Sequence, residues 1–435
     1  MIKQADAVII GAGIIGCAVA FELAKKGVKT VNIDKLPTAG FGPTSNSCAI
    51  IRAHYSTFEG TAFAYDNFWY WQNWRDYLEA DDELGYATYH DTGTIWIPNQ
   101  VQGYKHIVEL YEQVGVAYEI WEPETLRQKM PLFDTNSHWP PRRPENDDFW
   151  DESGEGLELA IFTPGSGYVS DPQLASHNLM RAAEARGGQF LFNQEVAAIR
   201  QTNNRVEGVT LSDGSHIDAP IVVNVAGPHS GVINRMAGVE AGMKVKTRPL
   251  RHEVHHVPSP ASFNYETDGI HVSDGDASVY FRPEVGNAIL VGSEDPECDV
   301  KEWVDDPDVF NRTLTTDQWK AQVYRLAKRI PDLPIPEKPS GVVDLYDVSD
   351  DWIPIYDKSS LDGFYMAIGS SGNQFKNAAG AGYLLAEIIS MAGNGQDHDL
   401  DPLQHKLPNI GVTIDASCFS RLREINPNSS FSVLG

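Results

Sequence analysis

The chain has 435 residues, 42% of them hydrophobic, so it is long enough to form two domains with buried cores. Its 60 acidic residues outnumber its 34 basic residues and give a formal net charge of −26, which disfavours binding to nucleic acid or to anionic membranes. No apolar run reaches the roughly 18 residues of a membrane-spanning helix, so we expect no membrane span.

A glycine-rich motif marks the N-terminal region. An apolar strand leads into G-x-G-x-x-G and a helix within residues 7–27, and a second strand then ends at Asp34. Gly11 makes the tight turn, Gly13 lets a pyrophosphate approach the backbone, and Gly16 lets helix and strand pack closely. The helix N-terminus offers amide donors to phosphates, and a carboxylate at position 34 can accept hydrogen bonds from a ribose hydroxyl. The motif alone is weak, but the whole unit predicts a dinucleotide site. We therefore expect the first apolar run to form the first strand and not a signal peptide.

The next hundred residues mix aromatic, strand and loop patterns. Residues 63–78 carry eight aromatic side chains at helical spacing, which favours packing between domains over an aromatic box for a substrate ammonium. A strand is predicted at 94–97 and a helix near 101–115. Residues 134–156 are rich in proline and charge, which favours a surface insertion over a mobile lid.

Strands and helices alternate along the second half of the chain. Asp171 and Pro172 begin a predicted helix that runs to residue 186. Further strands are predicted at 221–227, at several places within 241–344, and at 363–369 before a helix over 375–391. This interleaving predicts an α/β (α+β) fold.

The four cysteines, at positions 17, 48, 298 and 418, show neither C-x-x-C nor zinc-ligand spacing. A disulfide scaffold is improbable in a chain of this length, so we expect a reducing compartment and a cytoplasmic protein. We predict no metal site, and we interpret His252, His255 and His256 as structural.

Five stretches together resemble the FAD-dependent amine and amino-acid oxidoreductases of the D-amino-acid oxidase superfamily, such as sarcosine oxidases, dimethylglycine dehydrogenases and glycine oxidases. They are residues 11–34, 42–52, 167–172, 222–230 and 367–378. The resemblance covers nearly the whole chain. It implies a Rossmann-type FAD-binding domain interleaved with a mixed β-sheet substrate domain. The FAD-binding domain would comprise 1–85, 166–240 and 345–410, the substrate domain 86–165 and 241–344, and the C-terminal tail 411–435.

The resemblance also implies which residues meet the cofactor. The first stretch would bind the ADP half, residues 44–51 would run beside the pyrophosphate and isoalloxazine, and residues 369–376 would cover the pyrimidine end of the flavin. The implied FAD-binding residues are Gly11, Gly13, Ile14, Gly16, Asp34, Lys35, Thr44, Ser45, Cys48, Ala49, Val196, Ala226, Gly227, Gly369, Ser371, Gly372, Asn373, Gln374 and Lys376.

Three residues are implied to take part in catalysis. Arg52 and Lys376 match the pair that holds a substrate carboxylate in monomeric sarcosine oxidases, and we favour this clamp over two solvated charges. His54 is a candidate base, although a satisfied polar histidine is the favoured interpretation.

Several positions depart from the family's sequence pattern, and they change what we expect of flavin attachment and of the reaction with oxygen. Val343 stands where those oxidases attach flavin to a cysteine, and Thr44-Ser45-Asn46 replaces the threonine-tryptophan-histidine run of covalent dimethylglycine dehydrogenases, so FAD is expected to bind non-covalently. Leu290 stands where sarcosine oxidases place a lysine over the flavin, which predicts a poor reaction with oxygen unless Arg282 supplies the charge. We expect no folate-binding domain after Pro408, and hence no tetrahydrofolate-coupled demethylase of the long type.

These observations predict oxidation of a small, N-alkylated amino acid that carries a carboxylate, followed by hydrolysis of the imine. Electrons would pass to a dye, a quinone or a flavoprotein, with oxygen as a further option. The alternatives are a D-amino-acid or glycine oxidase-like enzyme, a flavoprotein subunit of a heteromeric complex, and an NAD-dependent dehydrogenase.

Overall fold

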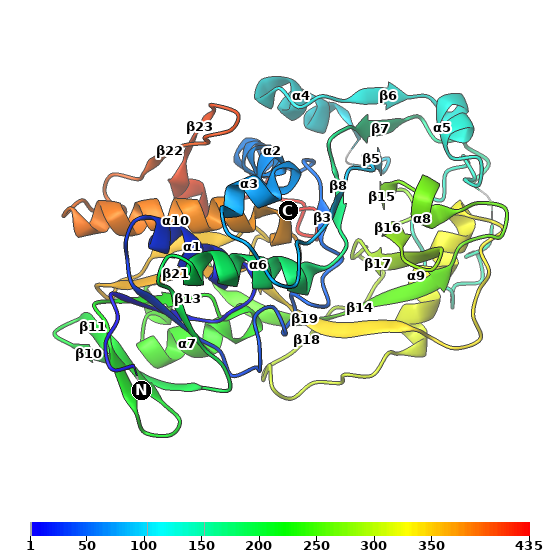
Figure 1. Ribbon diagram of the computed structural model, residues 1–435. Helices are drawn as coiled ribbons and strands as arrows, with labels where there is room; N and C mark the ends of the chain where they lie inside the picture. Colours follow the sequence, from blue (N-terminus) through cyan, green and yellow to red (C-terminus); the bar gives the residue numbers. More distant parts are fainter. Residues whose placement is uncertain (1, 102, 152) are drawn as a thin grey trace.

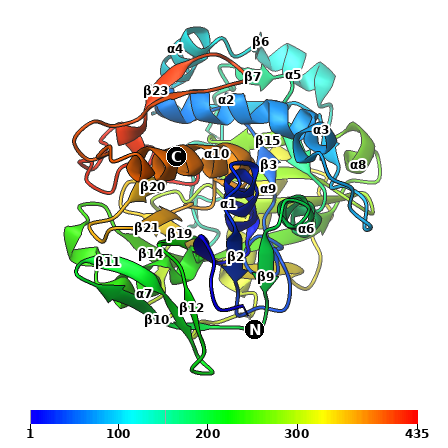
Figure 2. The same ribbon diagram turned by 60° about the vertical axis from the view of Figure 1, so that its left-hand side comes forward.

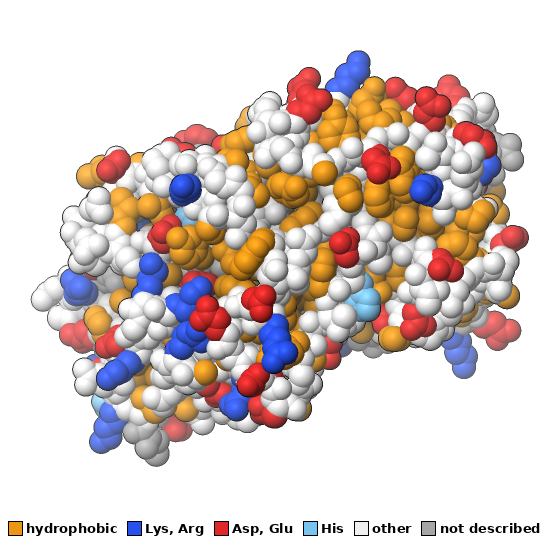
Figure 3. Space-filling view, turned by 45° about the horizontal axis from the view of Figure 1, so that its top comes forward, with side chains coloured by type: hydrophobic (Ala, Val, Ile, Leu, Met, Phe, Trp, Pro, Cys, Tyr) orange, Lys and Arg blue, Asp and Glu red, His pale blue; other side chains and the backbone are white. Residues whose placement is uncertain are grey.

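A computed structural model describes residues 2–101, 103–151 and 153–435. It shows two parts, each built on its own large sheet (Figure 1). Both signs of charge are interspersed with apolar side chains on the face in Figure 3. Among the described residues, no helix is long and apolar enough to cross a membrane.

The first part contains a six-stranded sheet in the order β20-β21-β13-β1-β2-β9. The strands are β20 (Ile355–Lys358), β21 (Phe364–Ile368), β13 (Ile221–Asn224), β1 (Ala7–Ile10), β2 (Thr30–Ile33) and β9 (Gln189–Leu191). All neighbouring pairs are parallel except the edge pair β20–β21. β1 is buried along its whole length, as expected for a parallel strand covered on both faces.

Alternate residues of β1 pack against two different layers. Figure 2 shows these layers on opposite sides of the sheet. Ala7 and Ile9 belong to the core formed with α1 (Ile14–Lys25), α6 (Pro172–Glu184) and α10 (Ala378–Gly393). Val8 and Ile10 belong to the core formed with α7 (Ser230–Ala237) and a three-stranded sheet. That sheet consists of β10 (Val196–Thr202), β11 (Arg205–Leu211) and β12 (His216–Asp218). The α/β class predicted from the sequence is therefore confirmed.

The second part contains a nine-stranded mixed sheet. Its order is β18-β14-β17-β16-β15-β5-β7-β6, and β19 also pairs with β14. The strands are β18 (Glu302–Trp303), β14 (Thr247–Pro258), β17 (Ala288–Ser293), β16 (Val279–Glu284), β15 (His271–Asp274), β5 (Thr94–Ile97), β7 (Ala160–Thr163), β6 (Glu119–Trp121) and β19 (Gly341–Ser349). Both segments predicted for the substrate domain thus contribute strands to one sheet, through the parallel pair β5–β15. The exact domain boundaries stay predictions, and the one at 345 falls inside β19.

Helices and a small sheet complete this part and its junction with the first. The helices are α4 (Lys105–Val114), α5 (Pro123–Lys129), α8 (Tyr265–Asp268) and α9 (Thr316–Arg329). The small sheet has the order β3-β8-β4, with β3 (Ile50–Ile51), β8 (Gly167–Val169) and β4 (Tyr89–His90).

The aromatic segment forms α2 (Phe58–Gln72) and α3 (Trp74–Leu78). The Trp71 ring stacks on Trp74 at 4.5 Å and on Phe375 at 5.1 Å between ring centroids. Its indole nitrogen donates a hydrogen bond to the backbone oxygen of Lys376 at 2.7 Å. These contacts favour a packing role over an aromatic box, but they join two segments of the predicted FAD-binding domain and not two domains.

The proline-rich segment 134–156, of which residue 152 lies outside the described residues, is held against α9. Lys328 donates to the backbone oxygen of Phe149 at 2.8 Å, and Arg325 donates to that of Arg142 at 3.0 Å. Trp150 packs on Tyr324 with 5.8 Å between ring centroids. These contacts favour the interpretation as a surface insertion.

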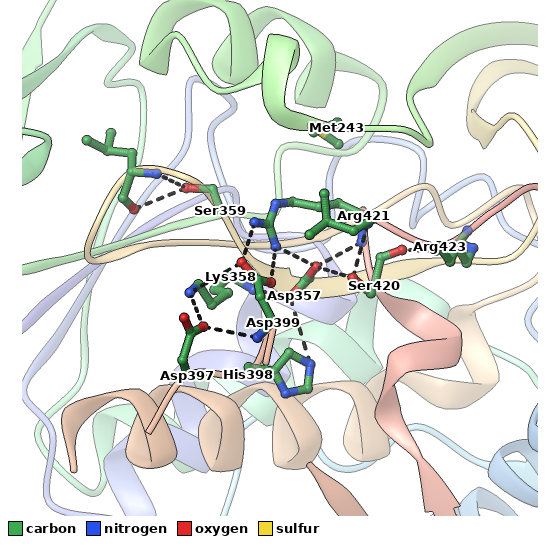
Figure 4. Close-up of polar contacts among 12 residues, drawn as sticks. Met243, Asp357, Lys358, Ser359, Asp397, His398, Asp399, Ser420, Arg421 and Arg423 are labelled. Atoms are coloured by element: carbon green, nitrogen blue, oxygen red, sulfur yellow. Dashed lines mark hydrogen bonds and ion pairs between the residues drawn. The ribbon is translucent and has the colours of Figure 1, made fainter. Parts of the chain in front are cut away.

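The C-terminal segment is anchored to the first part by buried charges (Figure 4). After β22 (Gln404–Lys406), β23 (Thr413–Asp415) and the short helix η4 (Ala416–Phe419), Arg421 pairs with Asp357 at 3.0 Å and with Asp399 at 2.8 Å. Lys358 pairs with Asp397 at 2.6 Å beside them. The chain then continues to Val433 and Leu434, which reach the main cavity. The segment predicted as a tail is therefore integrated into the fold.

Candidate active site

A cavity of about 630 Å³ lies where the two parts meet. It is lined by 17 of the residues predicted from the sequence: Gly11, Gly13, Ile14, Gly16, Asp34, Lys35, Thr44, Cys48, Ala49, Arg52, Val196, Ala226, Gly227, Gly372, Asn373, Gln374 and Lys376. Segments far apart in sequence therefore meet around one space.

Four predicted residues do not line it: Ser45, His54, Gly369 and Ser371. The Ser45 hydroxyl donates within its own turn to the Gly42 oxygen at 2.9 Å. The backbone N–H of Gly369 donates to Asp347 at 2.7 Å, and the Ser371 hydroxyl accepts from the N–H of Ser349 at 3.2 Å. The last two thus support the loop behind the cavity wall instead of facing a ligand.

The glycine turn leaves no room for larger side chains. A Cβ atom on Gly11, whose φ is +119°, would lie 2.4 Å from the Val225 oxygen, and one on Gly16 would lie 2.4 Å from the Gly11 oxygen. Gly13 supplies no side-chain cap to α1, and the Thr44 hydroxyl accepts from the N–H of Ile14 at 3.2 Å. The positive end of α1 therefore opens on the cavity, and this cradle fits the pyrophosphate of FAD.

Asp34 follows β2 at the other side of this turn. Its carboxylate accepts hydrogen bonds from the backbone N–H of Ala12 at 2.7 Å and of Leu36 at 2.9 Å. Burial raises the pKa of Asp34, and the two amide donors oppose that rise. Lys35 is tied to Asp308 by a contact of 2.5 Å and to the His229 ring at 2.9 Å. A carboxylate fixed by two amides keeps lone pairs for the hydroxyls of a ribose.

Tight packing also shapes the opposite end of the cavity. A Cβ atom on Gly372 would lie 2.5 Å from the Tyr346 ring, which stacks on His252 at 4.1 Å between centroids. One carboxylate oxygen of Asp347 and the side-chain nitrogen of Asn373 are buried without a hydrogen-bond partner. Burial raises the pKa of Asp347 to about 6. Unpaired buried polar atoms beside the cavity fit a polar ligand such as the flavin ring.

Two buried cations face the cavity together. Arg52 donates to the backbone oxygens of His54 and Val433, the latter at 2.7 Å, and its guanidinium lies over the Tyr55 ring. Lys376 donates to the Asn373 oxygen at 2.7 Å and to the Tyr55 hydroxyl at 3.1 Å. Neither cation forms an ion pair with any acidic residue in the part of the chain that the structure describes. Burial, followed by the charge of Arg52, holds the pKa of Lys376 well below its usual range.

The candidate base His54 lies behind the cavity wall. Its ring stacks on Trp96 at 5.8 Å between centroids, and both ring nitrogens are buried without a hydrogen-bond partner. Burial, and then the charge of Arg52, lower its pKa well below 6.5. His54 does not line the cavity, so it is not placed to act as a base on a ligand there. The favoured interpretation, a histidine whose ring nitrogens are hydrogen-bonded, is also wrong.

Sequence reasoning missed several polar lining residues, among them His271, Ser273 and Glu294, and it missed the C-terminal segment. His271 and Ser273 project from β15 toward the cavity, and Glu294 lines it directly after β17. One sequence signal could have indicated His271 and Ser273: they are polar residues two positions apart on a buried strand, so both side chains point to the same face. Nothing local marks Val433 and Leu434, which arrive from the far end of the chain.

The structure also locates the positions that the resemblance links to flavin attachment and to the reaction with oxygen. Val343 lines the cavity, and all four cysteines are free. Leu290 and Arg282 lie outside the lining. Arg282 donates to the Cys48 oxygen at 2.7 Å and forms an ion pair with Glu284 at 3.0 Å. Its charge is therefore paired outside the cavity lining.

Comparisons with known proteins agree with this geometry. The family model described as "FAD dependent oxidoreductase" matches residues 6–388. Human mitochondrial sarcosine dehydrogenase is 26% identical over 428 residues, which cover 93% of this chain but 42% of that protein. The sarcosine oxidase subunit beta of Rhodobacter capsulatus is 23% identical, with 89% of this chain and 85% of that protein covered. Glycine oxidase of Geobacillus kaustophilus is 22% identical, with 95% and 100% covered.

Solved structures show the same fold. L-proline dehydrogenase from P. horikoshii superposes with a TM-score of 0.75 at 21% identity and covers 97% of this chain and 98% of its own. The G. kaustophilus glycine oxidase gives a TM-score of 0.72 at 18% identity, with 98% and 100% covered. The chain therefore belongs to the family of FAD-dependent oxidoreductases, and its cofactor is FAD.

Proposed function

We propose that this enzyme oxidises a small amino acid that carries an alkyl group on its amine, and that it binds FAD non-covalently. The single observation that carries the proposal is the pair of buried cations, Arg52 and Lys376, which face one cavity without an acidic partner among the described residues. Buried charges are costly unless they are paired, so this pair favours an anionic ligand. The carboxylate of an amino acid meets that need.

The clamp also fixes how such a substrate lies. Arg52 retains donors beyond those bound to His54 and Val433, and Lys376 retains one of its three. A carboxylate held by both would aim the substrate amine and its C–H bond into the cavity. Bound FAD supplies the acceptor for the hydride that leaves this bond. The imine that results is then hydrolysed by water.

The two cations have a second effect on the amine. Only a neutral amine can donate its lone pair into the breaking C–H bond. Positive charge near an ammonium lowers its pKa, so Arg52 and Lys376 favour the neutral form. The relatives named for sarcosine, an N-methyl amino acid, support N-alkylated substrates.

The glycine oxidase similarity, which spans the full length of that enzyme, favours a primary amino acid as the second candidate substrate. The experiment is anaerobic mixing of the FAD-loaded protein with N-methylglycine, N,N-dimethylglycine, glycine and D-alanine, followed by flavin absorbance. We expect the N-methyl compounds to bleach the flavin fastest and to release formaldehyde. Faster bleaching by glycine or D-alanine would support the second candidate, and no bleaching by any of them would overturn amine oxidation by the isolated chain.

A further inference from the structure

Glu294 is an acidic residue inside the cavity that the proposed clamp does not use. It follows β17 directly and is 6% exposed. The Ser273 hydroxyl of β15 donates a hydrogen bond to its carboxyl group. Within the described residues, Glu294 forms no ion pair with any basic side chain. It shares the cavity with Arg52 and Lys376.

The charges around Glu294 come from several elements. Arg52 is the nearby cation, and its charge lowers the pKa of Glu294, as does the hydrogen bond from Ser273. Asp274 and Asp295 are the nearby acids, and they raise it. Burial is the largest effect, and the balance raises the pKa of Glu294 to about 8.

The two acidic neighbours are already committed elsewhere. Asp274 pairs with Arg329 at 2.7 Å, and Asp295 pairs with His252 at 3.3 Å. Glu294 is therefore the acid of this group that is left for a ligand.

His271 of β15 is a further titratable residue of this cavity, two positions from Ser273. Its Nδ1 atom contacts the Thr94 hydroxyl at 3.0 Å, and its Nε2 atom is buried without a partner. Burial, and then the charges of Arg52 and Lys376, hold its pKa well below 6.5. An imidazole with so little affinity for a proton is a poor acceptor from an ammonium. Glu294, whose proton affinity is raised toward that of an amine, is the better one.

We infer that Glu294 accepts a proton from the substrate ammonium before oxidation, and that Ser273 positions its carboxylate. In this step an N–H bond of the ammonium breaks and an O–H bond forms on Glu294, while the electron pair stays on nitrogen as the lone pair. No oxidation or reduction accompanies the transfer. Glu294 returns the proton to water after the product leaves. This inference rests on the proposed function, because it requires an amine substrate.

The test is the pH profile of anaerobic flavin reduction, expressed as kcat/KM, for wild type, Glu294→Gln and Glu297→Gln. Glu297 is exposed and lies three residues further on, which makes it the matched control. We expect Glu294→Gln to lose about 100-fold at pH 7.5, within the usual range for general base catalysis. The loss should shrink toward pH 10, because neutral amine is then abundant in solution. A loss that is equal at every pH, or no loss, would overturn the inference.

Ser273→Ala provides a second readout if Glu294→Gln fails to fold. Removing the hydrogen bond that lowers the pKa of Glu294 should move the acidic limb of the wild-type profile to higher pH. An unmoved limb would contradict the role of Glu294. Wild-type protein that no amine reduces would instead contradict the proposed function, so the two failures are distinguishable.

Discussion

Replacement of Lys376 by methionine tests the carboxylate clamp most cleanly. Methionine is unbranched and only one atom shorter than lysine, so it keeps most of the side-chain volume and removes the charge. Arg52 is a poorer target, because its guanidinium also holds the backbone oxygens of His54 and Val433. Loss of those buried bonds would disturb the cavity wall itself, at about 1–3 kcal/mol for each unsatisfied group.

The size of the effect follows from the donors of Lys376. Its ammonium has three N–H groups, of which two are directed to Asn373 and Tyr55, so one remains for a substrate carboxylate. A hydrogen bond to a charged group contributes about 1.5–3 kcal/mol, which corresponds to about 10- to 150-fold in kcat/KM. Folding should be little affected, because the substitution removes a desolvated charge from a site that is 3% exposed.

The assay is anaerobic flavin reduction by the best substrate, with the flavin spectrum and thermal unfolding as checks on the fold. Lys26→Met, at the exposed end of α1, is the matched control and should behave as wild type. If Lys376→Met keeps kcat/KM within about twofold of wild type while its FAD stays bound, the lysine does not hold the substrate and the reasoning from buried unpaired cations is refuted.

Three further predictions concern flavin attachment, the reaction with oxygen and the pH dependence of ligand binding. Acid precipitation should release all FAD into the supernatant, because position 343 is valine and the four cysteines are free. Flavin fluorescence that stays with the precipitated polypeptide would contradict this. Substrate-reduced enzyme should react slowly with oxygen in stopped-flow mixing, because Leu290 carries no charge and Arg282 is paired with Glu284 outside the cavity lining; reoxidation of wild type as fast as turnover would show an oxidase. The affinity for a non-oxidisable carboxylate should fall as pH rises through the pKa of Lys376, which lies well below 10.5, because the neutral amine attracts no anion; an affinity that is flat to pH 10 would contradict the lowered pKa.

The parts of the fold that depend on local pattern could be predicted from the sequence. The strand–glycine–helix unit appears where the motif placed it, and Asp171 accepts from the N–H of Leu174 at 2.8 Å as the cap of α6. The predicted helix over 375–391 begins as the short helix η3 (Phe375–Asn377) and continues as α10. Backbone propensity and caps act over a few residues, so they can be read from neighbours.

The parts of the site that depend on distant contacts could not be predicted in the same way. Val433 meets Arg52 across 381 residues of chain, and neither residue carries a pattern that indicates the other. His54 lies two residues from Arg52, yet packing against Trp96 holds it behind the wall. Glu294 has the appearance of an ordinary loop acid until the strands β15 and β17 bring it beside Ser273. Tertiary packing, rather than residue type, decides which polar side chains reach the cavity.

The most direct test of the central claim compares an N-methyl amino acid with its primary amide in wild type and in Lys376→Met. The amide keeps the amine and the reacting C–H bond but lacks the negative charge that the clamp would bind. The account predicts that the acid reduces the flavin of wild type much faster than the amide does, and that Lys376→Met slows the acid about 10- to 150-fold while hardly changing the amide. Equal losses for acid and amide in this variant would show that Lys376 acts on something other than the carboxylate, and would contradict the claim.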